Sequence, residues 1–138
     1  MIEALGASGA RTALICGTGL ALEGPVRGDW PFTEISSLVT PTTQTHAGLV
    51  QIYEGFERPL IQVRGRLHAY ETGSTAAMVP LYQALARAGV TRVILAGAVG
   101  SLDPALAPGD LAQVQDHLFF GGASPLVGQP RAFVEMAE

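Results

Sequence analysis

The sequence has a single cysteine and little charge. Cys16 has no partner for an internal disulfide, and a lone thiol in an apolar stretch fits a reducing cytoplasm. Charged residues make up 14% of the 138 residues, against roughly 25% in typical globular domains. So sparse a charged surface indicates that another subunit covers part of it, and we expect a homo-oligomer. The alternative is a monomer with a surface rich in Ala and Gly.

Long apolar runs and basic patches are missing as well. No stretch approaches the roughly 20 apolar residues needed to span a membrane, although 48% of the residues are hydrophobic. Residues 1–10 lack the basic start and apolar core of a signal peptide. The net charge is −4 and the eight Lys and Arg residues are scattered. We therefore expect neither nucleic acid nor a membrane as a partner.

Short apolar runs that end in glycine turns are the main feature of the chain. Residues 12–16 and 92–96 each form such a run, which is typical of a buried strand. Residues 49–54 and 60–63 flank a five-residue turn and are expected to form a hairpin. Residues 111–115 are expected to form a further strand after a Pro-Gly-Asp turn.

A helix is expected over residues 74–88, where apolar side chains recur at helical spacing before a glycine. Pro80 in this run indicates a kink or a later start. Residues 25–44 are rich in Pro, Thr and Ser and are expected to be loop with a short helical turn. The chain is expected to be loop-like after Phe120 and to begin a helix over residues 130–138.

Strand, helix and strand in this order predict an α/β fold, with a central mixed, largely parallel sheet flanked by helices. The length fits a single domain over residues 1–138. Ligands of such sheets lie at the carboxyl ends of the strands. Both glycine turns fall at this edge, so it is the expected location of a site.

Residues 65–71, with the sequence GRLHAYE, gather the most chemistry. If the preceding strand continues as extended chain, Arg66, His68 and Tyr70 point to one face. A neighbouring Arg and His suit an oxyanion such as phosphate. Glu71 would then orient His68 or Arg66 from behind. The alternatives are a surface ion pair of Arg66 with Glu71, a solvated His68 and a Tyr70 that packs in the core.

The turn Gly17-Thr18-Gly19 would let backbone N–H groups approach an anion, and Thr18 adds a hydroxyl. It lacks the third glycine of the dinucleotide fingerprint and the Lys of a P-loop, so a plain structural turn is the alternative. His46 follows a Thr-rich loop and could equally be an ordinary histidine. We expect no metal site, because His46, His68 and His117 lack ligand spacing along the chain.

Five motifs together resemble a known family. They are GTGL at residues 17–20, HAG at 46–48, GRLHAYE at 65–71, GAVGSL at 97–102 and PGDL at 108–111. Their order and approximate spacing are similar to those of the trimeric purine nucleoside phosphorylases and the related methylthioadenosine phosphorylases. The resemblance runs from about Arg11 to the end of the chain.

The resemblance implies a nucleoside phosphorylase-like fold, a trimer, and inorganic phosphate as co-substrate with no cofactor. It implies that the ribose contact is Tyr70 and that the carboxylate behind the phosphate ligands is Glu71, with His68 and Glu71 as catalytic residues. The phosphate site that it implies is formed by Thr18, His46, Arg66, His68 and the backbone N–H of Ala98.

The family reaction is phosphorolysis, in which phosphate and a purine nucleoside give ribose 1-phosphate and the free base. The family's chain continues for about as long again, and that continuation holds the residues that grip the purine. We therefore expect residues 1–138 to be a truncated domain that carries the phosphate- and ribose-binding half. The readings left open are an enzyme of this family, a non-catalytic phosphate-binding or structural remnant, and half of a split enzyme. Gly97 stands where the family typically has Asn.

Overall fold

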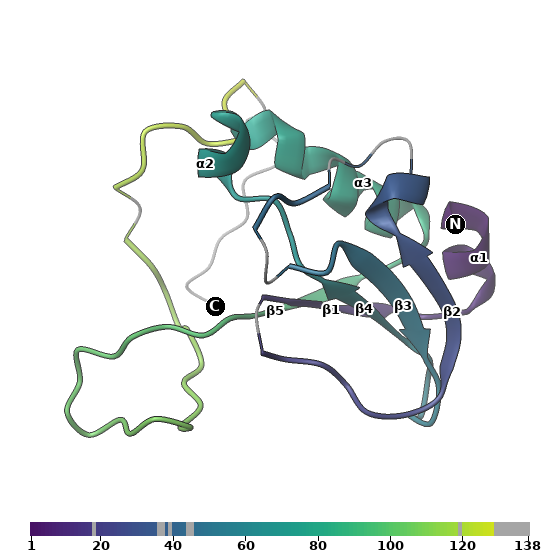
Figure 1. Ribbon diagram of the computed structural model, residues 1–138, viewed down its shortest axis with the longest axis horizontal. Coiled ribbons are helices and arrows are strands. Elements are labelled where there is room, and N and C mark those ends of the chain that lie inside the picture. Colours follow the sequence, from purple (N-terminus) through teal and green to yellow (C-terminus); the bar gives the residue numbers. More distant parts are fainter. Residues whose placement is uncertain (18, 36–37, 39, 44–45, 119, 129–138) are drawn as a thin grey trace. The chain divides into compact units, whose positions relative to one another are not determined.

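The computed structural model describes residues 1–128 with the exception of 18, 36–37, 39, 44–45 and 119. The chain divides into two units, Met1–Ala98 and Val99–Glu138. Among the described residues, every helix and strand belongs to the first unit (Figure 1). The single domain expected over residues 1–138 stays a prediction.

The first unit is built on a mixed sheet of five strands in the order β2-β3-β4-β1-β5. β1 runs parallel to both β4 and β5, whereas β3 runs antiparallel to both β2 and β4. The predicted α/β class with a mixed sheet is therefore confirmed. The strands are β1 (Thr12–Cys16), β2 (Val26–Pro31), β3 (Leu49–Tyr53), β4 (Leu60–Arg64) and β5 (Arg92–Ala96).

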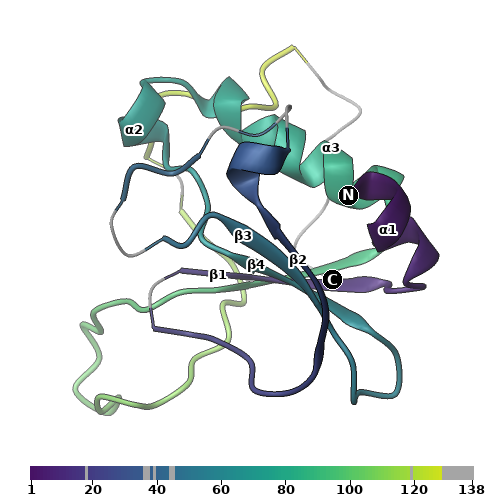
Figure 2. The ribbon, with the colours of Figure 1, turned by 45° about the vertical axis from the view of Figure 1, so that its right-hand side comes forward.

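Helices pack against one face of this sheet. Figures 1 and 2 show them on the same side of the strands in both views. The short α1 contributes the buried Leu5 and packs against α3, which buries Leu81 and Leu85 toward the strands. The helical segments are α1 (Ile2–Ala7), η1 (Phe32–Glu34), α2 (Ala69–Thr72), η2 (Thr75–Met78) and α3 (Val79–Arg87).

The core lies between these helices and every second residue of the strands, as the two-residue period of a strand requires. Ala13 and Ile15 of β1 are fully buried on this face, as are Ile61 and Val63 of β4. On the opposite face the fully buried Gln62 has its amide satisfied, because its Oε1 accepts a hydrogen bond from the N–H of Leu22 at 3.3 Å. The segment after β1 therefore covers that second face.

The expected hairpin of residues 49–54 and 60–63 is confirmed as the antiparallel pair β3 and β4. The helix expected over residues 74–88 begins with a 3-10 turn, and α3 starts later, with Pro80 in its first turn. There the missing N–H of proline costs no hydrogen bond. The expected loop over residues 25–44 contains β2, an edge strand that the Pro- and Gly-containing sequence concealed.

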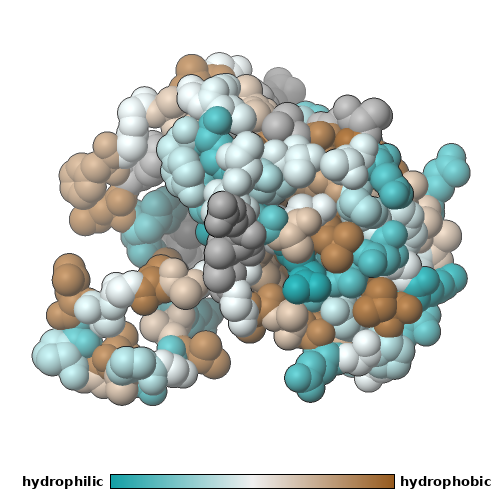
Figure 3. Space-filling view, in the orientation of Figure 1, coloured by the Kyte–Doolittle hydropathy of each residue, from teal (hydrophilic) through white to brown (hydrophobic). Residues whose placement is uncertain are grey.

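The second unit has no regular helix or strand over its described residues, 99–118 and 120–128. The strand expected over residues 111–115 is therefore wrong: this segment is irregular, and Leu111 and Val114 are largely exposed. A strand forms when its backbone groups pair with a neighbour, and this apolar run has none among the described residues. Figure 3 shows apolar side chains at the surface of the loop that Figure 1 draws in green. The helix expected over residues 130–138 lies outside the described residues.

Within the described part of the chain, no helix has the length and apolar character needed to cross a bilayer.

Candidate anion site at the strand ends

Two hydrogen bonds bring the glycine-containing segments together beyond the carboxyl ends of the parallel strands. The N–H of Gly17, after β1, donates to the carbonyl of Ala96 at the end of β5, at 3.2 Å. The N–H of Gly65, after β4, donates to the carbonyl of Cys16 at 2.8 Å. The segments that follow β1, β4 and β5 thus leave the sheet side by side, at the edge where ligands of parallel sheets bind.

The guanidinium of Arg66 lies between two of these segments. Its Nη1 atom is 3.5 Å from the position that a Cβ on Gly17 would take, and its Nη2 atom is 3.7 Å from the corresponding position on Gly97. Arg66 and Glu71 form no ion pair among the described side chains, where the recorded pair is Arg27 with Glu54 at 3.7 Å. The guanidinium therefore points to the glycine turns and not to its acidic neighbour.

His46 reaches the same place from another loop. Its Nδ1 lies 2.8 Å from the backbone carbonyl of Arg66, and because a carbonyl accepts, the ring donates through Nδ1. Its Nε2 is 3.7 Å from the Cβ position of Gly17, beside the Arg66 guanidinium. This close approach requires glycine at position 65, which has a φ of +97° and whose Cβ would lie 2.8 Å from the Cβ of His46.

His68 stands at the centre of a row of three rings. It stacks on His46 with ring centroids 5.0 Å apart and on Tyr70 with centroids 4.9 Å apart. The extended continuation expected through Tyr70 is wrong, because β4 ends at Arg64 and α2 begins at Ala69. The helical turn nevertheless keeps Tyr70 against His68. Tyr70 is 75% exposed, so the alternative that it packs in the core is excluded.

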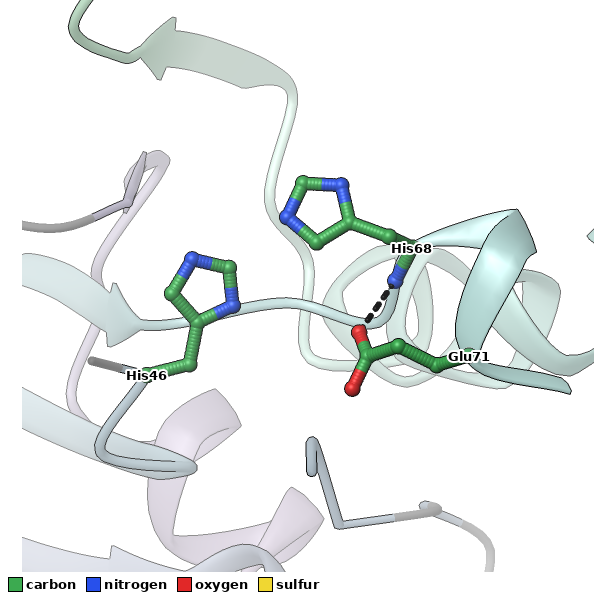
Figure 4. A group of neighbouring side chains, drawn as sticks. All are labelled: His46, His68 and Glu71. Carbon is green, nitrogen blue, oxygen red and sulfur yellow. Dashed lines mark hydrogen bonds between the residues drawn. The ribbon is translucent and has the colours of Figure 1, made fainter. Parts of the chain in front are cut away.

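Glu71 holds this segment and a neighbouring loop together. Its Oε1 accepts from the N–H of His68 at 2.7 Å, as Figure 4 shows. Its Oε2 accepts from the N–H and hydroxyl of Thr42 at 2.6 and 2.8 Å and from the N–H of Thr43 at 3.2 Å. These bonds, first the one from His68 and then those from Thr42 and Thr43, lower the pKa of Glu71 from 4.5 to about 2.

The pKa of His68 is lowered from 6.5. Desolvation is the largest cause, followed by the positive charges of Arg66 and His46, while Glu71 acts in the opposite direction. A cation-rich site of this kind favours an added negative charge. Desolvation together with these charges favours the neutral form of the His68 ring.

An open hollow of about 230 Å³ lies along the turn after β1. It is lined by Gly17, Gly19, Leu20, Ala21, Ala47, Arg64 and Gly65. Arg64 was missed in the sequence, where it reads as an ordinary strand residue. Thr42 and Thr43 were missed too, and their place in a run of threonines was the one available signal. The two threonines contact Glu71 because their loop folds back onto it from elsewhere in the chain.

One cluster of side chains has the residue types of a metal site: the ligand atoms of His46, His68 and Glu71 lie within 4.8 Å of one another. The spacing of these residues along the chain did not reveal the cluster. Both carboxylate oxygens of Glu71 already accept hydrogen bonds. The positive charge of Arg66 is close enough to His68 to lower the pKa of its ring. A cation would have to displace those donors and lie close to a guanidinium, so the arrangement suits an anion better. The absence of a metal from the functional site stays a prediction.

Four of the expected site residues are thus brought together: His46, Arg66, His68 and Glu71. Tyr70 lies at their rim. Ala98 directly follows Gly97, beside the Arg66 guanidinium, and is exposed. Thr18 lies outside the described residues.

Residues 11–138 match a protein family described as the phosphorylase superfamily. The purine nucleoside phosphorylase of Mycobacterium leprae is 32% identical over 121 residues, which are 84% of this chain and 45% of the relative. Purine nucleoside phosphorylase 1 of Bacillus subtilis is 30% identical over 129 residues, covering 88% of this chain and 46% of its own length. The chain thus spans less than half the length of these relatives.

A solved structure gives the same fold. The crystal structure of Schistosoma mansoni purine nucleoside phosphorylase in complex with inosine superimposes with a TM-score of 0.69, at 23% identity, over 93% of this chain and 44% of that one. The motifs, the mixed sheet and the match over residues 11–138 agree. This chain therefore belongs to the phosphorylase superfamily, and the relatives that it matches are purine nucleoside phosphorylases.

Proposed function

We propose that this chain carries the phosphate- and ribose-binding half of a purine nucleoside phosphorylase-type pentosyltransferase. The reaction would convert a purine nucleoside and inorganic phosphate to ribose 1-phosphate and the free base. Phosphate would be a co-substrate, and no cofactor is needed. The matched relatives carry this activity in their names.

One observation carries the proposal: the Arg66 guanidinium points between the turns at Gly17 and Gly97, with Nε2 of His46 beside it. A guanidinium that is not engaged by Glu71 offers several N–H donors in one plane, which suits the oxygens of a phosphate. The glycines leave room for the anion to approach the backbone, where the N–H of Ala98 and the hydroxyl of Thr18 are further proposed donors.

In this reaction a phosphate oxygen attacks the anomeric carbon of the sugar. The new C–O bond forms as the C–N bond to the base breaks, and the electron pair of that bond leaves with the base, which must take up a proton. Positive charge develops on the sugar ring meanwhile, so the phosphate acts both as nucleophile and as counter-charge. The hydrogen-bond donors that bind the phosphate must therefore hold it in position without fully neutralising its negative charge.

The geometry supports a positioning role for Glu71. Its oxygens fix the backbone of His68 and the Thr42–Thr43 loop, which sets the place of the His68 ring relative to His46. His68 would then contact phosphate. Tyr70, stacked outside His68 and 75% exposed, would cover the ribose. Its hydroxyl lies 3.5 Å from that of Thr43, so both could meet sugar hydroxyls.

A binding function without turnover is the alternative. It is favoured by one observation: the chain spans 45% and 46% of the two bacterial relatives, and His46, Arg66 and His68 of the proposed anion site all lie within that part. Phosphate-dependent release of hypoxanthine from inosine by the pure chain distinguishes the two. Release supports the enzyme, whereas phosphate binding with no release supports the binding function. A chain that shows neither overturns both.

Phosphate binding itself is tested by thermal shift. Phosphate at ~100 times its dissociation constant should stabilise the protein by about 2.7 kcal/mol. Arg66→Ala should abolish this stabilisation, and Arg58→Ala is the matched control. Arg58 is an exposed arginine in the β3–β4 turn, at the opposite end of β4, so its loss changes the net charge equally without touching the site. An equal loss in both variants would mean that general electrostatics, and not a site, binds phosphate.

A homo-oligomer and a cytoplasmic location remain parts of the proposal. The first is supported by the sparse charge of the chain, 14% of its residues, and the second by its single buried cysteine. The trimer stays a prediction from the resemblance.

A further inference from the structure

Gln62 is a polar side chain in the middle of β4, between Ile61 and Val63, and it is fully buried. Glutamine is seldom found completely inside a protein, because an amide that leaves water must find hydrogen-bond partners there. An apolar side chain of the same size would fill this position without that requirement. What the buried amide binds therefore indicates why it is there.

The hydrogen-bond partners of Gln62 among the described residues lie in β1 and in the segment that follows it. Its Oε1 accepts from the N–H of Leu22 at 3.3 Å. Its Nε2 donates to the carbonyl of Leu20 at 3.5 Å and to the Sγ of Cys16 at 3.4 Å. A carbonyl only accepts and an N–H only donates, so these partners fix the orientation of the amide. One side chain of β4 thus binds the last residue of β1 and the backbone of the following segment at two points.

The segment of residues 19–24 depends on these bonds for its position. It forms neither helix nor strand, and Leu20 is 46% exposed. Over the described part of the chain, the hydrogen bonds recorded for this segment all lead to Gln62. A stretch with few backbone hydrogen bonds and little burial opens easily. The amide of Gln62 is therefore the main polar contact that gives this segment a defined place.

The same segment borders the proposed anion site. Gly19, Leu20 and Ala21 line the hollow of about 230 Å³ along the turn after β1. Just before them, the Cβ position of Gly17 lies 3.5 Å from Nη1 of Arg66. The bonds from Gln62 to Leu20 and beyond thus hold one wall of the hollow.

We infer that Gln62 is a positioning residue for the proposed anion site, an inference that rests on the proposed phosphate-binding function. Its buried amide fixes the backbone of Leu20 and Leu22 and so the wall of the hollow beside the Arg66 guanidinium. Gln62 itself touches no anion and acts through that backbone. Because coupling between two sites is reciprocal, a bound phosphate should in turn hold the segment of residues 19–24 more firmly. A glutamine that only completes the packing would show no such coupling.

Hydrogen exchange in the unmodified chain tests this coupling. The amide of Leu22 should exchange more slowly than those of Ala21 and Glu23, for which the described residues provide no recorded acceptor. Inorganic phosphate at ~100 times its dissociation constant should slow the exchange of Leu22 at least about fivefold further. The amide of Thr91, which donates to the carbonyl of Arg11 at 2.9 Å, should respond less. Equal rates at the three amides, or a Leu22 rate that phosphate leaves unchanged, would overturn the inference.

Gln62→Met tests the role of the amide, because methionine has a similar length and no N–H or carbonyl group. Calorimetry should show about tenfold weaker binding of inorganic phosphate, the size expected for the loss of about one hydrogen bond. The slow exchange at Leu22 should also be lost. Gln51→Met is the matched control, since Gln51 lies opposite Gln62 on β3, is 8% exposed and bonds to Tyr53. Equal weakening in both variants would reveal a general effect of removing a buried amide and would contradict the positioning role.

These measurements distinguish a failure of this inference from a failure of the proposed function. An unmodified chain that binds no phosphate in the calorimeter overturns the proposed function and the positioning role with it. Phosphate binding that Gln62→Met leaves unchanged overturns the positioning role alone. If Gln62→Met does not fold, the exchange of Leu22 in the unmodified chain, with and without phosphate, decides the question.

Discussion

His46 occupies the space that any side chain at Gly65 would need. A Cβ at position 65 would lie 2.8 Å from the Cβ of His46 and 3.1 Å from its Cα. Two segments far apart in the chain thus touch backbone to side chain, and this contact places the imidazole beside the Arg66 guanidinium. The geometry of the proposed anion site therefore depends on the absence of a side chain at Gly65.

Replacing Gly65 by Ala tests this dependence. We expect the free energy of unfolding to fall by about 3 kcal/mol, because a positive φ costs a non-glycine residue roughly 1–2 kcal/mol and the overlap with His46 adds overpacking. Gly73→Ala is the control, since Gly73 also has a positive φ but nothing within 4 Å of its Cβ position. Urea denaturation should show a loss of about 1 kcal/mol there, and equal losses would argue against the contact.

Glu71 should make stability depend on pH in the acid range. Its pKa is about 2 in the folded protein and 4.5 ordinarily, so its contribution is complete above pH 4.5 and is lost as the pH falls toward 2. The wild type should exceed Glu71→Gln in stability at neutral pH, and the difference should shrink across that window. Thermal melts at stepped pH measure it, with Glu57→Gln in the exposed turn as control. A difference that does not change with pH would refute the role of the carboxylate charge.

The same carboxylate should protect a loop. Hydrogen exchange at the amides of Thr42, Thr43 and His68 should accelerate in Glu71→Ala, because all three N–H groups donate to it. The amide of Phe32, which donates to the carbonyl of Gly48 at 2.7 Å, is an internal control that should keep its rate. Unchanged exchange at the two threonines would show that other contacts hold the loop.

His68 should titrate below 6.5, because burial and the charges of Arg66 and His46 disfavour its protonated form. Since its pKa is lowered by folding, protonation of His68 destabilises the protein as the pH falls through 6.5. NMR titration of the ring should show a higher pKa in Arg66→Ala and, in the wild type, on addition of phosphate. If the pKa of His68 does not change when phosphate is added, the anion binds elsewhere.

Tyr70 should matter for the sugar and little for the fold. It is 75% exposed, so Tyr70→Ala should change the free energy of unfolding by no more than about 0.5 kcal/mol. Binding of ribose 1-phosphate should weaken while binding of inorganic phosphate is retained, which calorimetry with each ligand can separate. Tyr82→Ala on α3 is the matched control, at 36% exposed. Equal loss for both ligands would make Tyr70 part of the phosphate site.

Local patterns predicted the parts of the fold that local physics controls. The hairpin of β3 and β4 followed from two apolar runs around a turn, and α3 from helical spacing that ends at Gly89. β2 was concealed because its stability comes from pairing with β3 and not from its own residues. Leu111–Gln115 has the composition of a strand and failed to become one for the complementary reason: no described neighbour pairs with it.

The sequence by itself determined the residue types of the site and the strand ends at which they gather, because glycine turns and a segment with Arg, His, Tyr and Glu are local features. Tertiary structure alone decided that His46 stacks on His68, that Thr42 and Thr43 bind Glu71, and that Arg66 points away from that carboxylate. These contacts join loops 20 to 30 residues apart. The antiparallel pairing of β3 with β4 sets Leu49 opposite Arg64 and so brings the loop before β3 beside the segment after β4. Which side chains meet there depends on how that loop folds back, and no local pattern encodes this.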